Sequence, residues 1–157
     1  MSSNEPDLPR RGLGSSELEV SVMSLGSWRT FERIPTEQGI EVMQAARRSG
    51  INFLDDARYD DETGDAPIPT GYSEVLFGNL VRAAGFDRDE VVIANKLWWE
   101  FWPRQDAAEE LDSSLGRMGF DRVDLIYAIH PPEGLSIETV VEQVRAYEDA
   151  HRSRTPG

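Results

Sequence analysis

The chain has 157 residues, 39% of them apolar, a formal net charge of −13 and no cysteine. This length and apolar content suit one domain with a core, while the missing thiols exclude disulfides and zinc–thiolate sites. The acidic balance opposes binding to nucleic acid or anionic membranes. Since no apolar run reaches the length of a membrane span and the N-terminus lacks a secretory signal, we expect a cytoplasmic protein.

The first half of the chain predicts a hairpin, two strands and a helix after a flexible leader at residues 1–8. Glycines and serines at positions 12–16 indicate a turn, so residues 10–26 predict a short hairpin followed by a strand. A helix is expected over residues 35–50, with Thr36 as its N-cap. Residues 51–55 predict a buried strand that ends at Asp55, and a polar loop rich in Gly and Pro follows.

The second half repeats the alternation of helix and strand. A helix is expected over residues 73–85, with Ser73 as its N-cap. A strand, a helix, a strand and a last helix capped by Ser136 are then expected over residues 90–96, 106–117, 122–130 and 136–150. Four successive strand–helix units predict a parallel sheet with helical crossovers, in one domain over residues 9–150. Residues 151–157 are expected to form a separate tail.

Three polar residues stand at the predicted carboxyl ends of three strands: Asp55, Lys96 and His130. Lys96 is the only lysine among 16 basic residues, and lysine, unlike arginine, can lose its proton when buried. A single Asp–Lys pair or a lone histidine is more often structural than catalytic. Because chemistry collects at this end of parallel sheets, the three together favour a catalytic site.

These residue types suit the reduction of a carbonyl group. Asp55 can pair with a buried Lys96, and a tyrosine beside that ammonium would have its pKa lowered. Such a tyrosine can donate a proton to a developing alkoxide while His130 orients the carbonyl. No side chain supplies hydride, so a nicotinamide cofactor would be required.

Two further stretches carry alternative interpretations. The aromatic residues after Lys96 either wall a substrate pocket, which we favour, or fill structural space; they are Trp98, Trp99, Phe101 and Trp102. The acidic residues 60–65 lack the ligand spacing of an EF-hand, which favours a solvated loop over a cation site. We therefore expect no metal.

Several stretches resemble the aldo-keto reductase family, from about Arg10 to about Val144. They are GLGSSELEVSVMSLGSW, GINFLDDARY, GYSEVLFG, VVIANK and, most distinctively, LDSSLGRMGFDRVDLIYAIHPP. The resemblance implies a (β/α)8 barrel of the TIM type and NADPH-dependent reduction of a small aldehyde or ketone. The family's catalytic tetrad is matched by Asp55, Tyr59, Lys96 and His130. Its NADP(H) site implies cofactor contacts at Gly26, Ser27 and Trp28, together with Asp55.

The chain departs from the family's pattern in two local details. Tyr59 follows Asp55 one residue earlier than the family's tyrosine does, so Tyr72 is a rival for the proton donor. The stretch between Asp124 and His130 is one residue longer than usual. A shift by one residue turns a strand's side chains to the opposite face unless a bulge restores them.

Length is the third departure, because a barrel of this type needs roughly 250 residues. We expect a truncated barrel of about four βα units with an N-terminal hairpin, weak or inactive as an enzyme. The missing half would carry, by resemblance, most adenosine and phosphate contacts. Self-association or pairing with that second half is expected, because open sheet edges and an apolar inner face would be exposed. The alternatives are a non-enzymatic binding or regulatory module and a non-functional remnant of the family.

Overall fold

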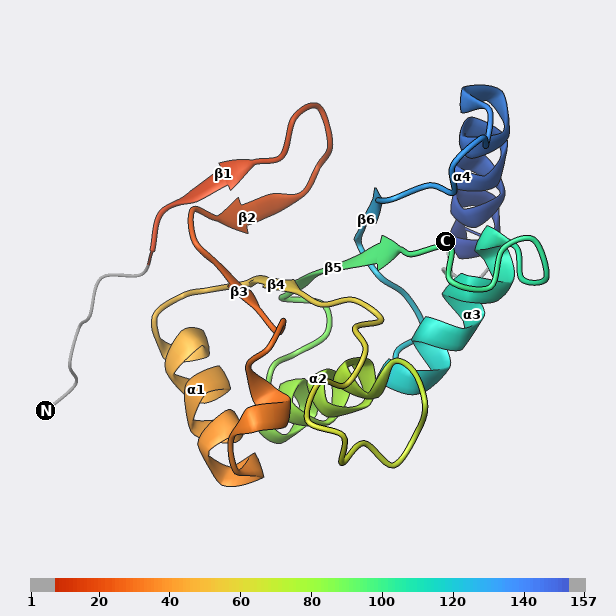
Figure 1. Ribbon diagram of the computed structural model, residues 1–157. Coiled ribbons are helices and arrows are strands. Elements are labelled where there is room, and N and C mark those ends of the chain that lie inside the picture. Colours follow the sequence, from red (N-terminus) through yellow and green to blue (C-terminus); the bar gives the residue numbers. More distant parts are fainter. Residues whose placement is uncertain (1–7, 153–157) are drawn as a thin grey trace, which may run out of the picture.

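The computed structural model describes residues 8–152, which form six short strands and four α-helices (Figure 1). The strands are β1 Arg10–Gly12, β2 Glu19–Ser21, β3 Ser24–Gly26, β4 Phe53–Asp55, β5 Val92–Leu97 and β6 Leu125–Ala128. The α-helices are α1 Thr36–Arg48, α2 Tyr72–Ala83, α3 Ala107–Met118 and α4 Ile137–Arg152, and a 3-10 turn covers Phe31–Arg33. The expected leader and tail lie almost wholly outside the described residues.

The strands form an antiparallel hairpin and a four-stranded parallel sheet. β1 pairs with β2, and the sheet has the order β3-β4-β5-β6. Helices α1, α2 and α3 lie along one side of this sheet, and α4 packs beside α3 (Figure 1). The predicted alternation of strand and helix is confirmed. Because all four strands run in the same direction, their carboxyl ends form one rim. The site predicted from the sequence needs such a rim, since its residues come from different strands.

Local signals at the helix ends were only partly correct. Thr36 is not an N-cap, because Pro35 occupies that position and no side chain caps α1. Ser73 is not one either: Gly71, with a φ of 73°, precedes α2, and Ser73 lies inside its first turn. Ser136 does cap α4, since its hydroxyl accepts a hydrogen bond from the backbone N–H of Thr139 at 3.2 Å.

β6 is shorter than expected. It ends at Ala128, two residues before His130, which has a φ of 48°. The chain therefore leaves the sheet in a left-handed turn, a backbone region that side chains other than glycine seldom adopt. The prediction that this strand ends at His130 is therefore wrong. The turn after the strand, and not the strand itself, sets the direction of the imidazole.

The core lies between the sheet and the helices. Its fully buried side chains include Met43 of α1, Leu54 of β4, Phe77 of α2, Ile93 of β5 and Leu111 of α3. Each helix therefore contributes one apolar face, as its spacing predicted. β5 is buried along nearly its whole length, in agreement with its continuous apolar sequence.

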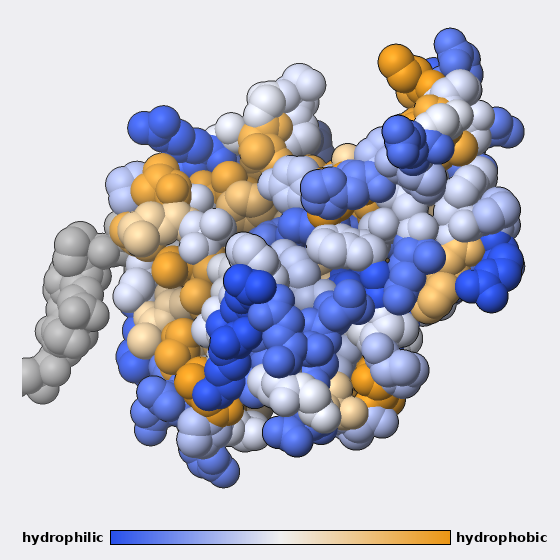
Figure 2. All heavy atoms as spheres, in the orientation of Figure 1, coloured by the Kyte–Doolittle hydropathy of each residue, from blue (hydrophilic) through white to orange (hydrophobic). Residues whose placement is uncertain are grey.

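Several large apolar side chains remain exposed. Val22 and Met23 follow the hairpin, Tyr127 lies on the edge strand β6, and Ile137 and Val141 lie on α4. In the space-filling view, hydrophobic residues gather on the side of the hairpin and α1, and a few more stand at the projecting end of α4 (Figure 2). None of the described helices is long and apolar enough to cross a membrane.

The packing of α2 against α3 generates a prediction. A Cβ at Gly78 would overlap the carbonyl oxygen of Met118 and lie 2.7 Å from its carbonyl carbon. Since backbone cannot move aside cheaply, we expect Gly78→Ala to lower the free energy of unfolding by roughly 1–3 kcal/mol. The matched control is Gly116→Ala on α3, where the space is open. There we expect a gain of up to about 1 kcal/mol from helix propensity. Urea unfolding of both variants decides, and equal effects would contradict the close approach.

Candidate active site

An ion pair joins the ends of two neighbouring strands. Asp55 is the last residue of β4, and it pairs in register with Ala94 of β5, two residues before Lys96. The Nζ of Lys96 lies 2.8 Å from each carboxylate oxygen of Asp55, and it also donates to the backbone oxygen of Asp56 at 3.2 Å. The Lys96 side chain is 15% exposed. The sequence prediction that these two residues meet is confirmed.

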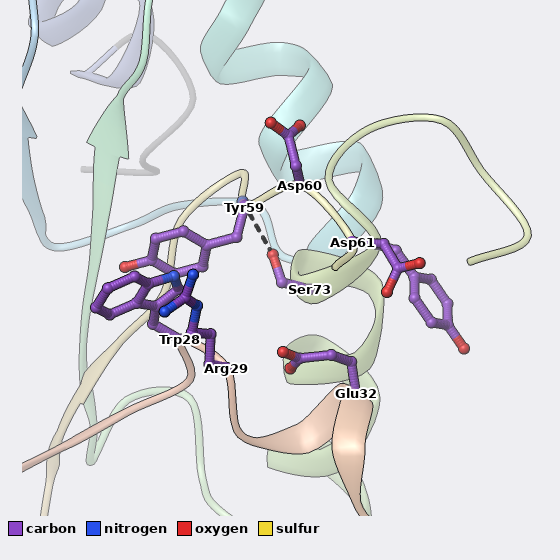
Figure 3. A pocket seen from close by; sticks show the side chains of 8 residues that line it. Trp28, Arg29, Glu32, Tyr59, Asp60, Asp61 and Ser73 are labelled. Atoms are coloured by element: carbon purple, nitrogen blue, oxygen red, sulfur yellow. Dashed lines mark hydrogen bonds between the residues drawn. The ribbon is translucent and has the colours of Figure 1, made fainter. Parts of the chain in front are cut away.

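Tyr59, not Tyr72, lies beside this ion pair. The centre of its ring is 5.4 Å from the Nζ of Lys96. Ser73 fixes the turn that carries Tyr59: its hydroxyl donates to the oxygen of Ala57 at 2.6 Å and accepts from the N–H of Tyr59 at 3.2 Å (Figure 3). Tyr72 lines a neighbouring pocket, whose lining also includes Trp28, Tyr59 and Asp60 (Figure 3). The missed cap at Ser73 thus has a cause, because its hydroxyl is bound to the loop after β4.

A cavity of about 330 Å³ opens at this rim. Its lining combines the ion pair's lysine with aromatic and acidic side chains, namely Trp28, Tyr59, Asp60, Glu62, Lys96, Trp98, Ile129 and His130. His130 lines the cavity although the stretch before it is one residue longer than the family's pattern. The left-handed backbone at His130 redirects the side chain, as a bulge in the strand could have done. The structure therefore brings Tyr59, Lys96 and His130 to one cavity, with Asp55 bonded to the lysine.

Burial and charge oppose each other at Tyr59 and Lys96. Burial and the charges of Asp55 and Asp56 raise the pKa of Tyr59, the hydrogen bond and charge of Lys96 lower it, and the net direction is upward. The sequence expectation of a lowered tyrosine pKa is wrong for that reason. Burial alone would lower the pKa of Lys96. Asp55 and Tyr59 raise this pKa by more than burial lowers it, so the net direction is upward. Lys96 is thus held as an ammonium and Tyr59 as a neutral phenol, a proton donor.

Of the residues assigned to the cofactor, Gly26 ends β3 beside Asp55, and Ser27 and Trp28 follow that strand. Gly26 pairs with Asp55, and a Cβ there would meet open space. The N–H of Ser27 donates to the oxygen of Asp55 at 3.0 Å. The indole of Trp28 is 58% exposed, lies 6.2 Å from the ring of Tyr59, and carries the guanidinium of Arg29 over it (Figure 3). This open backbone and exposed flat ring fit the nicotinamide end of a dinucleotide.

The same lining offers little to the phosphates of a dinucleotide. Lys96 is the only lysine or arginine among the described residues that line the cavity, and Asp60 and Glu62 line it as well. Phosphate groups are held by arginine, lysine or helix N-termini. The cavity itself therefore suits the hydride-donating ring better than the anionic part of a cofactor.

The aromatic segment after Lys96 divides between two roles. Trp98 lines the cavity, edge-on to Tyr59 with ring centres 5.6 Å apart. Trp99 is 5% exposed and belongs to the core, where Trp102 packs against it at 5.8 Å. Phe101 lies under the guanidinium of Arg58 at 6.0 Å. The expected pocket wall is Trp98, whereas Trp99 fills structural space.

The acidic loop is held together by its own carboxylates. Asp61 accepts hydrogen bonds from the backbone N–H groups of Thr63, Gly64 and Ala66, at 2.7–3.1 Å, and from the Thr63 hydroxyl. The bond from the Thr63 hydroxyl contributes most to lowering the pKa of Asp61 to about 2. Glu62 pairs with Arg29 at 2.6 Å and with Arg33 at 2.9 Å. Within residues 8–152 no group of side chains has the arrangement of a metal site.

Sequence reasoning missed a buried carboxyl directly behind the ion pair. Asp56 is fully buried, its Oδ1 accepts a hydrogen bond from the Ser27 hydroxyl, and its Oδ2 has no hydrogen-bond partner among the described residues. Burial, and then the neighbouring Glu74, raise the pKa of Asp56 well above its usual range. Only the adjacent pair of aspartates at 55–56 hinted at it, and that doublet does not say which carboxyl faces inward.

The chain is similar to known proteins over most of its length. The family model for the aldo/keto reductase family matches residues 22–153. The "probable voltage-gated potassium channel subunit beta" of Arabidopsis thaliana is 30% identical over 139 residues, and that of Oryza sativa is 31% identical. Each match covers 83% of this chain and 40% of the relative, so the chain spans less than half the length of these relatives.

Solved structures give the same result for the fold. A protein assigned as an aldo-keto reductase from Pseudomonas aeruginosa superposes with a TM-score of 0.70 at 26% identity, covering 98% of this chain and 60% of that one. A thermostable aldo-keto reductase superposes with a TM-score of 0.73 at 23% identity, covering 94% of this chain and 51% of that one. The latter supports the fold alone.

Asp56 generates a prediction on stability and pH. Its folded-state pKa is raised, so as the pH rises from about 4 the unfolded chain releases a proton that the folded chain keeps. The free energy of unfolding should therefore fall as the pH rises through the folded pKa. Between the unfolded and the folded pKa of Asp56, the wild-type protein should lose roughly 1–3 kcal/mol of unfolding free energy that Asp56→Asn does not lose. Urea unfolding between pH 4 and 9 measures it, and Asp65→Asn in the exposed loop should keep the wild-type slope. A slope unchanged in Asp56→Asn would show that Asp56 is not the group responsible.

Proposed function

The chain belongs to the aldo/keto reductase family, an oxidoreductase family, and we propose that its site reduces the carbonyl group of a small aldehyde or ketone with NADPH. The observation that supports this most is the Lys96–Asp55 ion pair beside Tyr59 in one cavity with His130. A cytoplasmic location is part of this proposal.

In this proposal each residue has one task. The Tyr59 hydroxyl donates its proton to the carbonyl oxygen, and the Lys96 ammonium, held by Asp55, stabilises the phenolate that remains. His130 hydrogen-bonds the same oxygen and orients the carbonyl. Trp98 excludes water from one side, which strengthens these interactions. NADPH supplies the hydride when it is bound, and the residues that would hold its nicotinamide end are Gly26, Ser27 and Trp28.

The proposal includes weak turnover for this chain. The described lining of the cavity contains Asp60, Glu62 and a single lysine, whereas the cofactor carries several negative charges. Like charges raise the cost of binding an anion. We therefore propose that the cofactor binds weakly here, because its phosphates find no basic partner in the cavity.

A regulatory or binding module is the second candidate. Two relatives carry the name of a potassium channel β subunit, a subunit of a larger assembly. In this chain exposed apolar side chains lie at both edges of the parallel sheet, Val22 and Met23 before β3 and Tyr127 on β6. Such surfaces favour association, either with a second copy of the chain or with another protein.

Trp fluorescence separates the two candidates. Trp28 and Trp98 line the cavity, so NADPH binding there should quench their emission in a saturable way. If NADPH causes no quenching while sedimentation shows association that grows with concentration, the binding-module interpretation replaces the reductase. Saturable quenching that Trp28→Phe reduces supports the cofactor site.

Substitutions at the rim test the roles directly. We expect the slow NADPH oxidation at 340 nm with a reactive aromatic aldehyde to fall at least about 100-fold in Tyr59→Phe and in Lys96→Met, the scale of general acid catalysis. Tyr72→Phe is the matched control, because Tyr72 is outside the cavity, and it should keep wild-type turnover. Turnover that survives in Tyr59→Phe and disappears in Tyr72→Phe would make Tyr72 the acid.

A further inference from the structure

A single buried carboxylate holds the turn that carries the aromatic wall of the cavity. Glu110 lies on α3, is 4% exposed and does not line the cavity. We propose that Glu110 is a positioning residue that fixes Trp98 between Tyr59 and His130. The placement of Trp98 stands independently of any reaction; its consequence for substrate binding rests on the proposed function.

Both carboxylate oxygens of Glu110 are used by this turn. Oε1 accepts the backbone N–H of Trp98, and Oε2 accepts the backbone N–H of Trp99 at 2.9 Å. Hydrogen bonds to an ionised acceptor are among the stronger ones in proteins. Because two consecutive N–H groups point at one carboxylate, the peptide between the two tryptophans is fixed in orientation.

The backbone at this point needs such support. Trp99 has a φ of 65°, in the left-handed region that bulky side chains avoid. This conformation reverses the chain, so that Trp98 lines the cavity while Trp99 is buried in the core. Without Glu110 the turn would lose the two acceptors that offset its strain, and the two indoles would be free to exchange or relax their positions.

Trp98 stands between the two residues proposed to act on the carbonyl oxygen. Its ring is edge-on to Tyr59 at 5.6 Å and to His130 at 6.2 Å. The guanidinium of buried Arg58 lies 5.7 Å from the centre of the same ring. Arg58 also pairs with Glu100, two residues after Trp98, so a second charged side chain holds the same loop. A displaced Trp98 would therefore change the wall of the cavity beside both residues.

The chemistry of Glu110 favours positioning over simple packing. A carboxylate buried on α3 costs more than an apolar side chain would at the same place, even with two N–H groups and the charge of Arg58 to stabilise it. Burial raises the pKa of Glu110, and the net direction is upward although the two N–H groups and the charge of Arg58 lower it. Glu110 thus lowers the stability of the core compared with an apolar residue, but it binds two N–H groups that an apolar residue could not bind. Such a compromise is expected of a group that supports a functional site.

Fluorine NMR of protein labelled with 5-fluorotryptophan tests the placement directly. The four resonances are assigned with Trp→Phe variants at each position. In Glu110→Gln one N–H loses its acceptor and meets an amide NH₂ group, so we expect the Trp98 and Trp99 resonances to shift or broaden while Trp28 stays unchanged. Glu109→Gln, one residue earlier on α3, keeps the capping box and should leave all four resonances unchanged.

Each outcome decides the proposal. A folded Glu110→Gln protein with an unchanged Trp98 resonance overturns it. If Glu110→Gln does not fold by circular dichroism, Glu110→Asp is used, which keeps the charge and shortens the side chain. Unfolding of both variants assigns Glu110 a role in stability alone and also overturns the proposal.

Turnover tests the consequence separately. Where the wild-type chain oxidises NADPH with an aromatic aldehyde, Glu110→Gln should raise KM several-fold with a smaller change in kcat, because the wall rather than the proton donor is displaced. An unchanged KM with a shifted Trp98 resonance removes the wall's effect on substrate. A wild-type chain without turnover defeats the proposed function, while the NMR result still decides the role of Glu110.

Discussion

The architecture of the site depends on one constraint: a largely buried ammonium needs a carboxylate, and parallel strands in register supply it. Asp55 and Lys96 are 41 residues apart in sequence, yet the pairing of β4 with β5 places both at the same rim. The ion pair in turn gives Tyr59 a fixed cation beside its ring. If β5 slipped by one residue, the ammonium would point to the opposite face and the cavity would lose its only lysine.

Behind this rim lies a layer of buried acids that serves the site at the expense of the core. Asp56 and Glu110 are buried with raised pKa values, and the charge of Glu74 contributes to both shifts. Glu74 is itself bonded to Asn95 at 3.0 Å and to Arg117 at 2.6 Å. Apolar residues would be cheaper at these positions. Three carboxyls therefore hold backbone and side chains that apolar packing could not hold: the Ser27 hydroxyl, the turn at Trp98 and the α2–α3 contact.

The sequence predicted those parts of the fold that depend on periodicity and on strand ends. Asp55 and Lys96 each follow an apolar run, and that pattern alone placed them at one rim. Position-specific details depended on contacts that a sequence does not display. Ser73 and Thr36 have the chemistry of caps, but Ser73 binds the loop after β4 and Pro35 occupies the cap of α1. The choice between Tyr59 and Tyr72 was set by the path of a loop without regular structure.

The proton-handling and cofactor-holding parts of the proposed reaction separate along this chain. Everything needed to hold a phenol, an ammonium and an imidazole at one cavity comes from four strand–helix units, because each group stands on or just after a strand of the same sheet. Binding a dinucleotide also needs cations for its phosphates. The described lining of this cavity has two carboxylates and one lysine, which is already bonded to Asp55. The geometry of the site is therefore no measure of its affinity for cofactor. A site of this kind can keep its catalytic arrangement while cofactor occupancy determines whether the chain acts as an enzyme or as a binding module.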